Sequence, residues 1–150
     1  MGYLRVTASE LEEMCDKLAE KIKNKFKPDC IVGVGRGGWV PAVYLSDRLG
    51  VKKLYGVKVD FYKGERRGRK PKVSQKPPLG KIRGNVLLVD DVADTGETLI
   101  VVKKMLERNA KEVRVATLHY KPHSKVKPDF FVQKTRRWVV YPYQTSEMGR

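Results

Sequence analysis

The segment from Val86 to Leu99, VLLVDDVADTGETL, constrains the fold of this 150-residue chain more than any other. Its apolar start has the pattern of a buried strand, and Asp90 and Asp91 follow where that strand ends. A polar turn containing Gly96 then leads into a segment whose apolar residues recur at helical spacing. Because ligands bind at the carboxyl ends of the strands in open α/β sheets, the segment predicts a binding site as well as a fold class.

The rest of the chain repeats this alternation of strands and helices. Thr7-Ala-Ser-Glu10 has the pattern of a capping box, and Pro41 and Gly50 suit the first turn and the end of a second helix. Strands that alternate with helices imply right-handed crossovers and a largely parallel sheet. We therefore expect one α/β domain over residues 1–150, with a mostly parallel sheet flanked by helices. The predicted strands are 30–34, 53–60, 85–90, 112–119 and 130–132, and the predicted helices start near residues 8, 40 and 98.

The charge of the chain is strongly positive and unevenly distributed. Lys and Arg number 32 against 17 Asp and Glu, a net charge of +15, which indicates anionic ligands or nucleic acid as partners. Residues 61–84 carry nine basic side chains and one acid, with several Gly and Pro and little periodicity. Since long irregular segments in compact domains are usually lids, binding loops or disordered, we interpret 61–84 as a mobile basic lid or hairpin.

The cysteines, the apolar runs and the histidines bear on the compartment of the protein, on membrane association and on zinc binding. Cys15 and Cys30 lie in apolar patterns without a C-x-x-C pair, so we expect reduced thiols and a cytoplasmic protein. No apolar run approaches the roughly 20 residues that span a bilayer, so we expect no membrane association. His119 and His123 have H-x-x-x-H spacing, but no Glu follows the first and Pro122 disfavours a helix, which argues against zinc.

The acid pair and the turn after it suggest two kinds of ligand group. The backbone N–H groups and hydroxyls from Thr95 to Thr98 would form a concave donor site at a helix N-terminus, which suits a phosphate. The carboxylates of Asp90 and Asp91 suit ribose hydroxyls or a hydrated Mg²⁺.

In these residues the chain resembles the type I phosphoribosyltransferases, because the apolar run, acid pair, Thr-Gly and Thr of their phosphoribosyl-pyrophosphate (PRPP) motif occur in order. The resemblance implies their fold, with a flexible basic lid, and a Mg²⁺-dependent reaction with PRPP as co-substrate. It implies that Asp90 and Asp91 bind the ribose hydroxyls and the metal. It also implies that the 5′-phosphate is bound by the six residues Ala93, Asp94, Thr95, Gly96, Glu97 and Thr98.

A glycine-rich stretch, GVGRGG, allows two interpretations. It fits the G-x-G-x-x-G pattern of dinucleotide-binding proteins, and Asp60 follows at a suitable distance for a ribose-binding acid. That interpretation leaves the acid pair and the polar turn without a role. The resemblance instead makes this stretch a pyrophosphate-binding loop, with a cis peptide at Gly35-Arg36 or beside it. The loop would consist of Gly35, Arg36, Gly37 and Gly38.

The resemblance also suggests which base accepts the phosphoribosyl group. Phosphoribosyltransferases for 6-oxopurines typically have an Asp at the position of Asp94, where it exchanges a proton with N7 of the base. The alternative is an ordinary helix-capping Asp. Lys121 would meet the exocyclic O6, Trp138 would stack on the base, and Val139 would offer backbone contacts, within a base-recognition segment of about 121–150. Alternatively, Trp138 belongs to the core.

The chain is most similar to the short xanthine-guanine and hypoxanthine enzymes, from about Ile31 to Pro142. After Pro142 it departs from their pattern, so the preference among guanine, hypoxanthine and xanthine stays open. The lid would exclude water from the reaction, with Tyr62 as its aromatic residue.

The expected function is transfer of the phosphoribosyl group of PRPP to N9 of a 6-oxopurine in purine salvage, by a homodimer or higher homo-oligomer. Two alternatives remain: an RNA-binding regulator on the same fold, and a phosphoribosyltransferase for another base. Aromatic residues do not interleave with the basic ones, which argues against nucleic acid.

Overall fold

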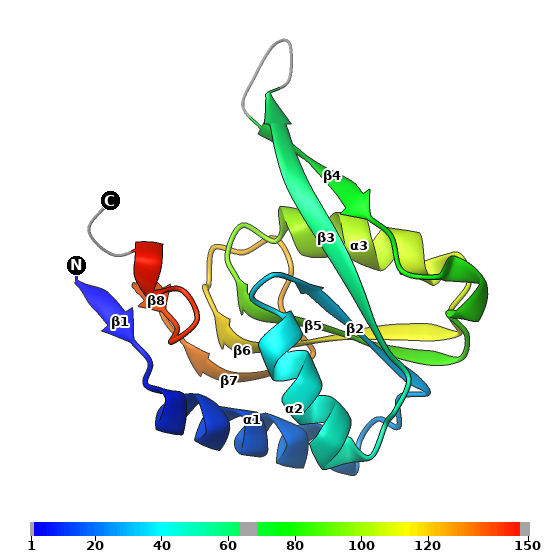
Figure 1. Ribbon diagram of the computed structural model, residues 1–150, viewed down its shortest axis with the longest axis horizontal. Helices are drawn as coiled ribbons and strands as arrows, with labels where there is room; N and C mark the ends of the chain where they lie inside the picture. Colours follow the sequence, from blue (N-terminus) through cyan, green and yellow to red (C-terminus); the bar gives the residue numbers. More distant parts are fainter. Residues whose placement is uncertain (1, 64–68, 148–150) are drawn as a thin grey trace.

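A six-stranded sheet forms the centre of the protein, in a computed structural model that describes residues 2–63 and 69–147 (Figure 1). The strand order is β4-β3-β2-β5-β6-β7. All neighbours pair in parallel except β3 and β4, which confirms the predicted mostly parallel α/β sheet. The strands are β2 (Cys30–Gly35), β3 (Leu54–Lys63), β4 (Arg69–Gln75), β5 (Asn85–Ala93), β6 (Glu112–Tyr120) and β7 (Phe130–Lys134).

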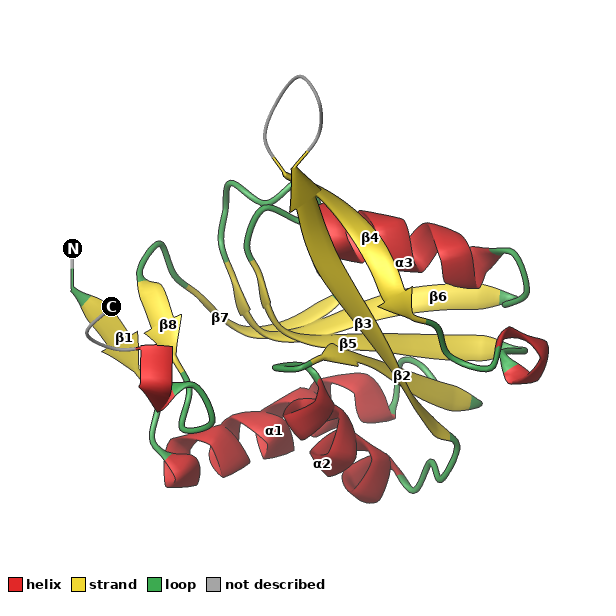
Figure 2. Ribbon diagram, turned by 45° about the horizontal axis from the view of Figure 1, so that its top comes forward, coloured by secondary structure: helices red, strands yellow, loops and turns green. Residues whose placement is uncertain are grey.

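Three helices cover the two faces of this sheet (Figure 2). Helices α1 (Ala8–Lys23) and α2 (Trp39–Leu49) lie on one face, and α3 (Glu97–Glu107) lies on the other. Successive residues of a strand point to opposite faces, so the central strands contribute to two cores. Leu87 packs in the core with α1 and α2, whereas Leu88 packs in the core with α3.

The helix ends follow the predicted signals. Thr7 accepts a hydrogen bond from the Glu10 backbone at 3.1 Å, and the Glu10 carboxylate accepts one from the Thr7 backbone at 3.1 Å. Helix α2 ends at Gly50, whose φ of 67° is a left-handed conformation that glycine adopts at little cost. These local signals place the helices correctly because they depend only on neighbouring residues.

Part of the basic segment 61–84, residues 61–63 and 69–75, lies in two paired strands. Strand β3 extends three residues beyond the predicted end, and β4 pairs with it in an antiparallel register from Lys58↔Gln75 to Lys63↔Arg69. The hairpin projects from the body of the sheet (Figure 1). Of the two interpretations of this segment, the structure supports the hairpin, although the predicted lid also includes residues 64–68, which lie outside the described residues.

A second, two-stranded sheet joins the ends of the chain and was not predicted. Strand β1 (Tyr3–Arg5) pairs in parallel with β8 (Trp138–Val140), in the register Tyr3↔Trp138. Each strand has only three residues, too few for a recognisable period, and the pairing connects segments at opposite ends of the chain. Two short 3₁₀ helices complete the described elements, η1 (Leu79–Lys81) and η2 (Thr145–Glu147).

Both cysteines are buried and free, in agreement with the expected reduced thiols. Burial raises the pKa of the Cys15 thiol to about 12 and also raises the pKa of Cys30. Within the described part of the chain, no helix is long and apolar enough to cross a membrane.

Candidate active site

The glycine loop and the acid pair meet at the carboxyl ends of β2 and β5. Strand β2 ends at Gly35, a cis peptide joins Gly35 to Arg36, and α2 begins at Trp39. The loop approaches β5 so closely that a Cβ on Gly38 would lie 2.6 Å from the carbonyl oxygen of Val89. Glycine is therefore required here by close backbone packing, and the loop lies beside the acid pair as expected.

Asp90 and Asp91 lie near the carboxyl end of β5, as expected, but the strand continues to Ala93, three residues beyond the predicted end at residue 90. An oxygen of each side chain accepts a backbone N–H from the following residue at 2.8 Å. Burial raises the pKa of Asp90 well above its usual range, with the neighbouring charge of Asp91 as a further cause. Burial also raises the pKa of Asp91. A half-buried and a buried carboxylate with raised pKa values favour a ligand that brings a cation or hydroxyl donors.

The C-terminal segment contacts this acid pair through residues that the sequence analysis did not identify. The Tyr141 hydroxyl donates to the carbonyl oxygen of Asp91 at 3.0 Å. The Tyr143 hydroxyl and the Gln144 amide each donate to Oδ2 of Asp91 at 3.3 Å. These residues lie about 50 positions from Asp91 and match no motif, so no local signal could have identified them.

Tyr141 is in turn supported by a buried histidine. Nδ1 of His119 lies 2.7 Å from the Tyr141 hydroxyl, whose proton is used toward Asp91, so Nδ1 carries the hydrogen. Burial lowers the pKa of His119 to about 4, which outweighs the opposing influence of Gln133 on the neighbouring strand. Gln133 does not reach Nε2 with hydrogen-bonding geometry, and that atom has no partner among the described residues. His119 is therefore a neutral core residue.

The polar turn between β5 and α3 surrounds a small cavity of about 80 Å³. Gly96 is the N-cap of α3, with a φ of 87° and no side chain of its own to cap the helix. The Thr95 hydroxyl accepts the Glu97 N–H at 3.3 Å, and the other first-turn N–H groups are available to a ligand. Asp94 does not cap α3, contrary to the alternative considered for it. The cavity is lined by Asp90, Val92, Asp94, Thr95, Gly96, Thr98 and Leu99.

A second cavity, of about 200 Å³, adjoins the first. Its walls include Lys121, Trp138 and Val139, the three residues expected to bind a base, together with Tyr141 and Gln144. Trp138 is 54% exposed, so it is not a core residue. The buried Lys121 ammonium lies 5.5 Å from the centre of the Trp138 ring.

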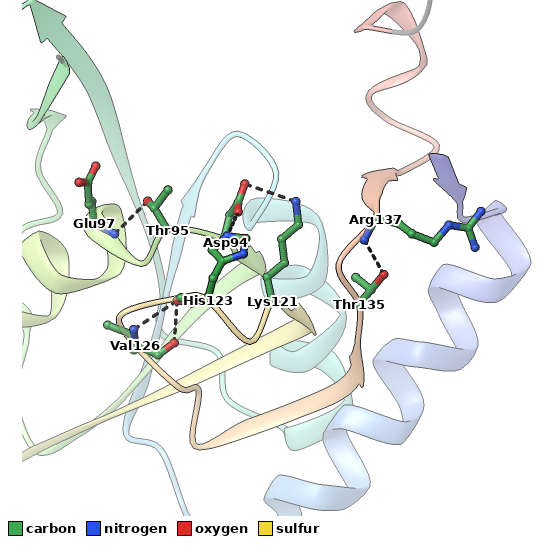
Figure 3. Close-up of polar contacts among 9 residues, drawn as sticks. Asp94, Thr95, Glu97, Lys121, His123, Val126, Thr135 and Arg137 are labelled. Atoms are coloured by element: carbon green, nitrogen blue, oxygen red, sulfur yellow. Dashed lines mark hydrogen bonds and ion pairs between the residues drawn. The ribbon is translucent and has the colours of Figure 1, made fainter. Parts of the chain in front are cut away.

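Asp94 lines both cavities, and its two carboxylate oxygens have different partners (Figure 3). Oδ1 lies 2.8 Å from Nε2 of His123, and Oδ2 lies 3.5 Å from Nζ of Lys121. The two histidines of the H-x-x-x-H pattern therefore have separate contacts, one with Tyr141 and one with Asp94. Among residues 2–63 and 69–147, no three His, Cys, Asp or Glu side chains are grouped as a metal site.

The predicted site residue Tyr62 lies outside both cavities. Tyr62 is on β3, 49% exposed, with the Lys72 ammonium 5.4 Å from its ring centre.

A larger cavity of about 740 Å³ is lined by residues such as Asp29 and Arg83, at the amino ends of β2 and β5. We place the site at the opposite edge because, among the described residues, carboxylates, a helix N-terminus and a buried lysine converge around the two cavities that Asp94 lines.

Comparison with known proteins finds relatives over nearly the whole chain. Residues 6–146 match the family model described as phosphoribosyl transferase domain. A xanthine-guanine phosphoribosyltransferase of Gluconobacter oxydans is 32% identical, over 97% of this chain and 87% of that protein. A purine phosphoribosyltransferase structure from Pyrococcus horikoshii has 40% identity and a TM-score of 0.88, covering 96% of this chain and 95% of its own. A hypothetical protein from Neisseria gonorrhoeae with bound ppGpp has 29% identity and a TM-score of 0.84, with coverage of 95% and 89%.

Proposed function

The chain belongs to the phosphoribosyltransferase family, and we propose that it transfers the 5-phosphoribosyl group of PRPP to N9 of a 6-oxopurine. The observation that carries this proposal is the position of Asp94, which lines both the turn cavity and the cavity with Lys121 and Trp138. A nucleotide has its phosphate and its base at opposite ends. Two adjoining cavities with an acid between them suit such a product.

In the reaction, the bond from C1′ to N9 of the purine forms as the bond from C1′ to the pyrophosphate oxygen breaks. The purine loses one proton, which Oδ2 of Asp94 takes from N7, and this makes N9 the better nucleophile. Lys121 binds the exocyclic O6, and Trp138 stacks on the ring. The N–H groups at the start of α3 bind the 5′-phosphate, and the loop Gly35 to Gly38 binds pyrophosphate.

The residues present fit Mg²⁺. Asp90 and Asp91 supply hard oxygen ligands, and a cation beside them would offset the cost of burying their charges, which raises the pKa of both. Mg²⁺ usually binds to one or two carboxylates and completes its shell with substrate oxygens and water, so two acids suffice. When bound, the metal neutralises charge on the pyrophosphate as it leaves.

We further propose that the β3–β4 hairpin closes over bound PRPP. Residues 61–84 carry a net charge of +8, which suits a polyanionic substrate, and closure would keep water from C1′. Tyr62 would face the ligand in the closed state. We expect a homodimer or higher homo-oligomer, as the family resemblance implies.

The test is pyrophosphate release from PRPP and Mg²⁺, with guanine, hypoxanthine, xanthine, adenine, uracil and orotate supplied separately. Turnover with 6-oxopurines alone supports the proposal and ranks the acceptors. Turnover with adenine or a pyrimidine would instead support a phosphoribosyltransferase for another base. No turnover with any base, combined with nucleic-acid binding that persists at moderate salt, would support the RNA-binding regulator.

A ligand of one relative suggests a second occupant of the same site. The Neisseria gonorrhoeae protein is described with bound ppGpp, a guanine nucleotide rich in phosphate. We propose that such a nucleotide binds in this chain with its base in the cavity lined by Lys121 and Trp138, here called the base cavity, and a phosphate at the polar turn before α3. Inhibition that is competitive with PRPP would support this, and inhibition unaffected by PRPP concentration would contradict it.

A further inference from the structure

The loop that follows β6, residues 121–126, forms backbone hydrogen bonds with the end of β5 and with the polar turn after it. The Lys121 N–H donates to the carbonyl oxygen of Ala93 at 3.0 Å, and the Lys125 N–H donates to that of Thr95 at 2.9 Å. His123 lies between these two bonds, and its ring extends to Asp94 (Figure 3). These two bonds hold the backbone on both sides of His123. The fold therefore places its ring within reach of Asp94.

The geometry of this contact determines where the histidine carries its hydrogen. Nε2 of His123 lies 2.8 Å from Oδ1 of Asp94, and an ionised carboxylate only accepts hydrogen bonds. Nε2 must therefore be the protonated nitrogen. His123 has a side-chain exposure of 55%, so Nδ1 can be satisfied by solvent.

The two partners of Asp94 differ in their relation to the base cavity. Lys121 is buried and lines that cavity, whereas His123 is absent from its lining. The following step rests on the proposed function. When the Lys121 ammonium turns to O6 of a purine, Oδ2 of Asp94 no longer pairs with it and faces the base. The contact with His123 then still restrains the carboxylate.

We propose that His123 is a positioning residue for Asp94. Its Nε2–H holds Oδ1, so that Oδ2 faces the base cavity and takes the proton from the purine. His123 itself does not touch the base. A hydrogen bond between two exposed side chains contributes little to folding stability, so the effect of His123 belongs to turnover rather than to the fold.

The test compares His123→Ala with Lys127→Ala, a matched change at an exposed residue of the same connection between β6 and β7. We expect His123→Ala to lower kcat with guanine or hypoxanthine roughly 10- to 100-fold, with KM for PRPP unchanged. His123→Gln keeps a side-chain N–H donor and should recover part of the loss. Lys127→Ala should behave as the wild type.

A double substitution separates positioning from a general structural effect. If His123 acts through Asp94, then His123→Ala should cause no further loss of kcat in an Asp94→Asn background. The same loss in both backgrounds, or an unchanged kcat in His123→Ala alone, would overturn the proposal.

A spectroscopic measurement keeps the proposal independent of the assigned reaction. In ¹⁵N NMR spectra the neutral ring of His123 should carry its hydrogen on Nε2, and Asp94→Ala should shift the Nε2 resonance because the hydrogen bond to the carboxylate is lost. If the wild type transfers phosphoribose to no base, the proposed function fails. If His123 carries its hydrogen on Nδ1, or if Asp94→Ala leaves the ring unchanged, the positioning role fails.

Discussion

Gly37 and Asp91 lie in direct contact across the ends of β2 and β5, since a Cβ on Gly37 would fall 1.9 Å from Oδ2 of Asp91. Of the three glycines in the loop, Gly37 is the one whose Cβ would lie nearest to the acid pair. Because Asp91 is already held by its neighbours, it has little freedom to move away. The two parts of the proposed PRPP site therefore depend on each other.

Gly37→Ala is the direct test of that contact. The new methyl group must displace the Asp91 carboxylate, so we expect PRPP binding to weaken at least roughly 10-fold, measured by calorimetry with Mg²⁺. Gly80→Ala is the matched control, because its Cβ would meet nothing within 4 Å. Equal PRPP affinity in both variants would contradict the assigned position of the pyrophosphate loop.

Asp94→Asn tests proton transfer. The amide fills the same space but cannot accept the N7 proton as a carboxylate does, so kcat should fall roughly 100-fold or more while PRPP affinity stays nearly constant. Steady-state kinetics with guanine measure the first quantity and calorimetry the second. Glu107→Gln, at the exposed end of α3, is the control. Normal turnover in Asp94→Asn would show that the assigned role is wrong.

Asp90→Asn separates binding from stability. Burial and the charge of Asp91 raise the pKa of Asp90, so ionising this side chain costs more in the folded protein than in the unfolded chain. The substitution should therefore increase the free energy of unfolding while weakening Mg²⁺–PRPP binding by roughly 10- to 100-fold. Urea denaturation and calorimetry measure the two effects. A variant that loses stability and keeps its PRPP affinity would contradict both expectations.

His119 should make the folded state sensitive to acid. Its pKa is about 4 in the folded protein, below the roughly 6.5 of an exposed histidine, so the unfolded chain binds the extra proton first. The buried neutral ring therefore makes its full contribution to folding stability above about pH 6.5, and this contribution is lost as the pH falls toward 4. At pH 5 the loss should be about 2 kcal/mol.

The measurement is urea denaturation of the wild type and His119→Gln at pH 7.5 and pH 5. The difference between the two proteins isolates His119, because other titrating groups contribute to both. A difference that does not change with pH would show that His119 is not buried as a neutral ring.

The thiols should be unreactive in the native state. Cys15 is fully buried with a pKa of about 12, and Cys30 is buried with a raised pKa, so little thiolate is present at neutral pH. We expect no rapid reaction with a disulfide reagent in the folded protein and reaction of both thiols in urea. Rapid modification of one thiol without denaturant would contradict the burial.

Much of the fold and part of the site could be predicted from local patterns. The capping box at Thr7, the left-handed Gly50 and the alternating strands and helices each depend on residues close in sequence. The turn after β5 was predictable for the same reason, since its acids, glycine and hydroxyls lie within ten residues. The pairing of β1 with β8 was not, because two segments of three residues carry no detectable period.

The sequence by itself determined which chemical groups this site can use, since Asp90, Asp91, Asp94 and the polar turn lie on one continuous segment. Only the tertiary structure decided the surroundings of those groups: Gly37 against Asp91, Tyr141 and Tyr143 on the same acid, and His123 on Asp94. The physical reason is that such contacts join residues about 30 to 50 positions apart. Strand order and loop packing bring them together, and a short-range sequence pattern carries no information about either.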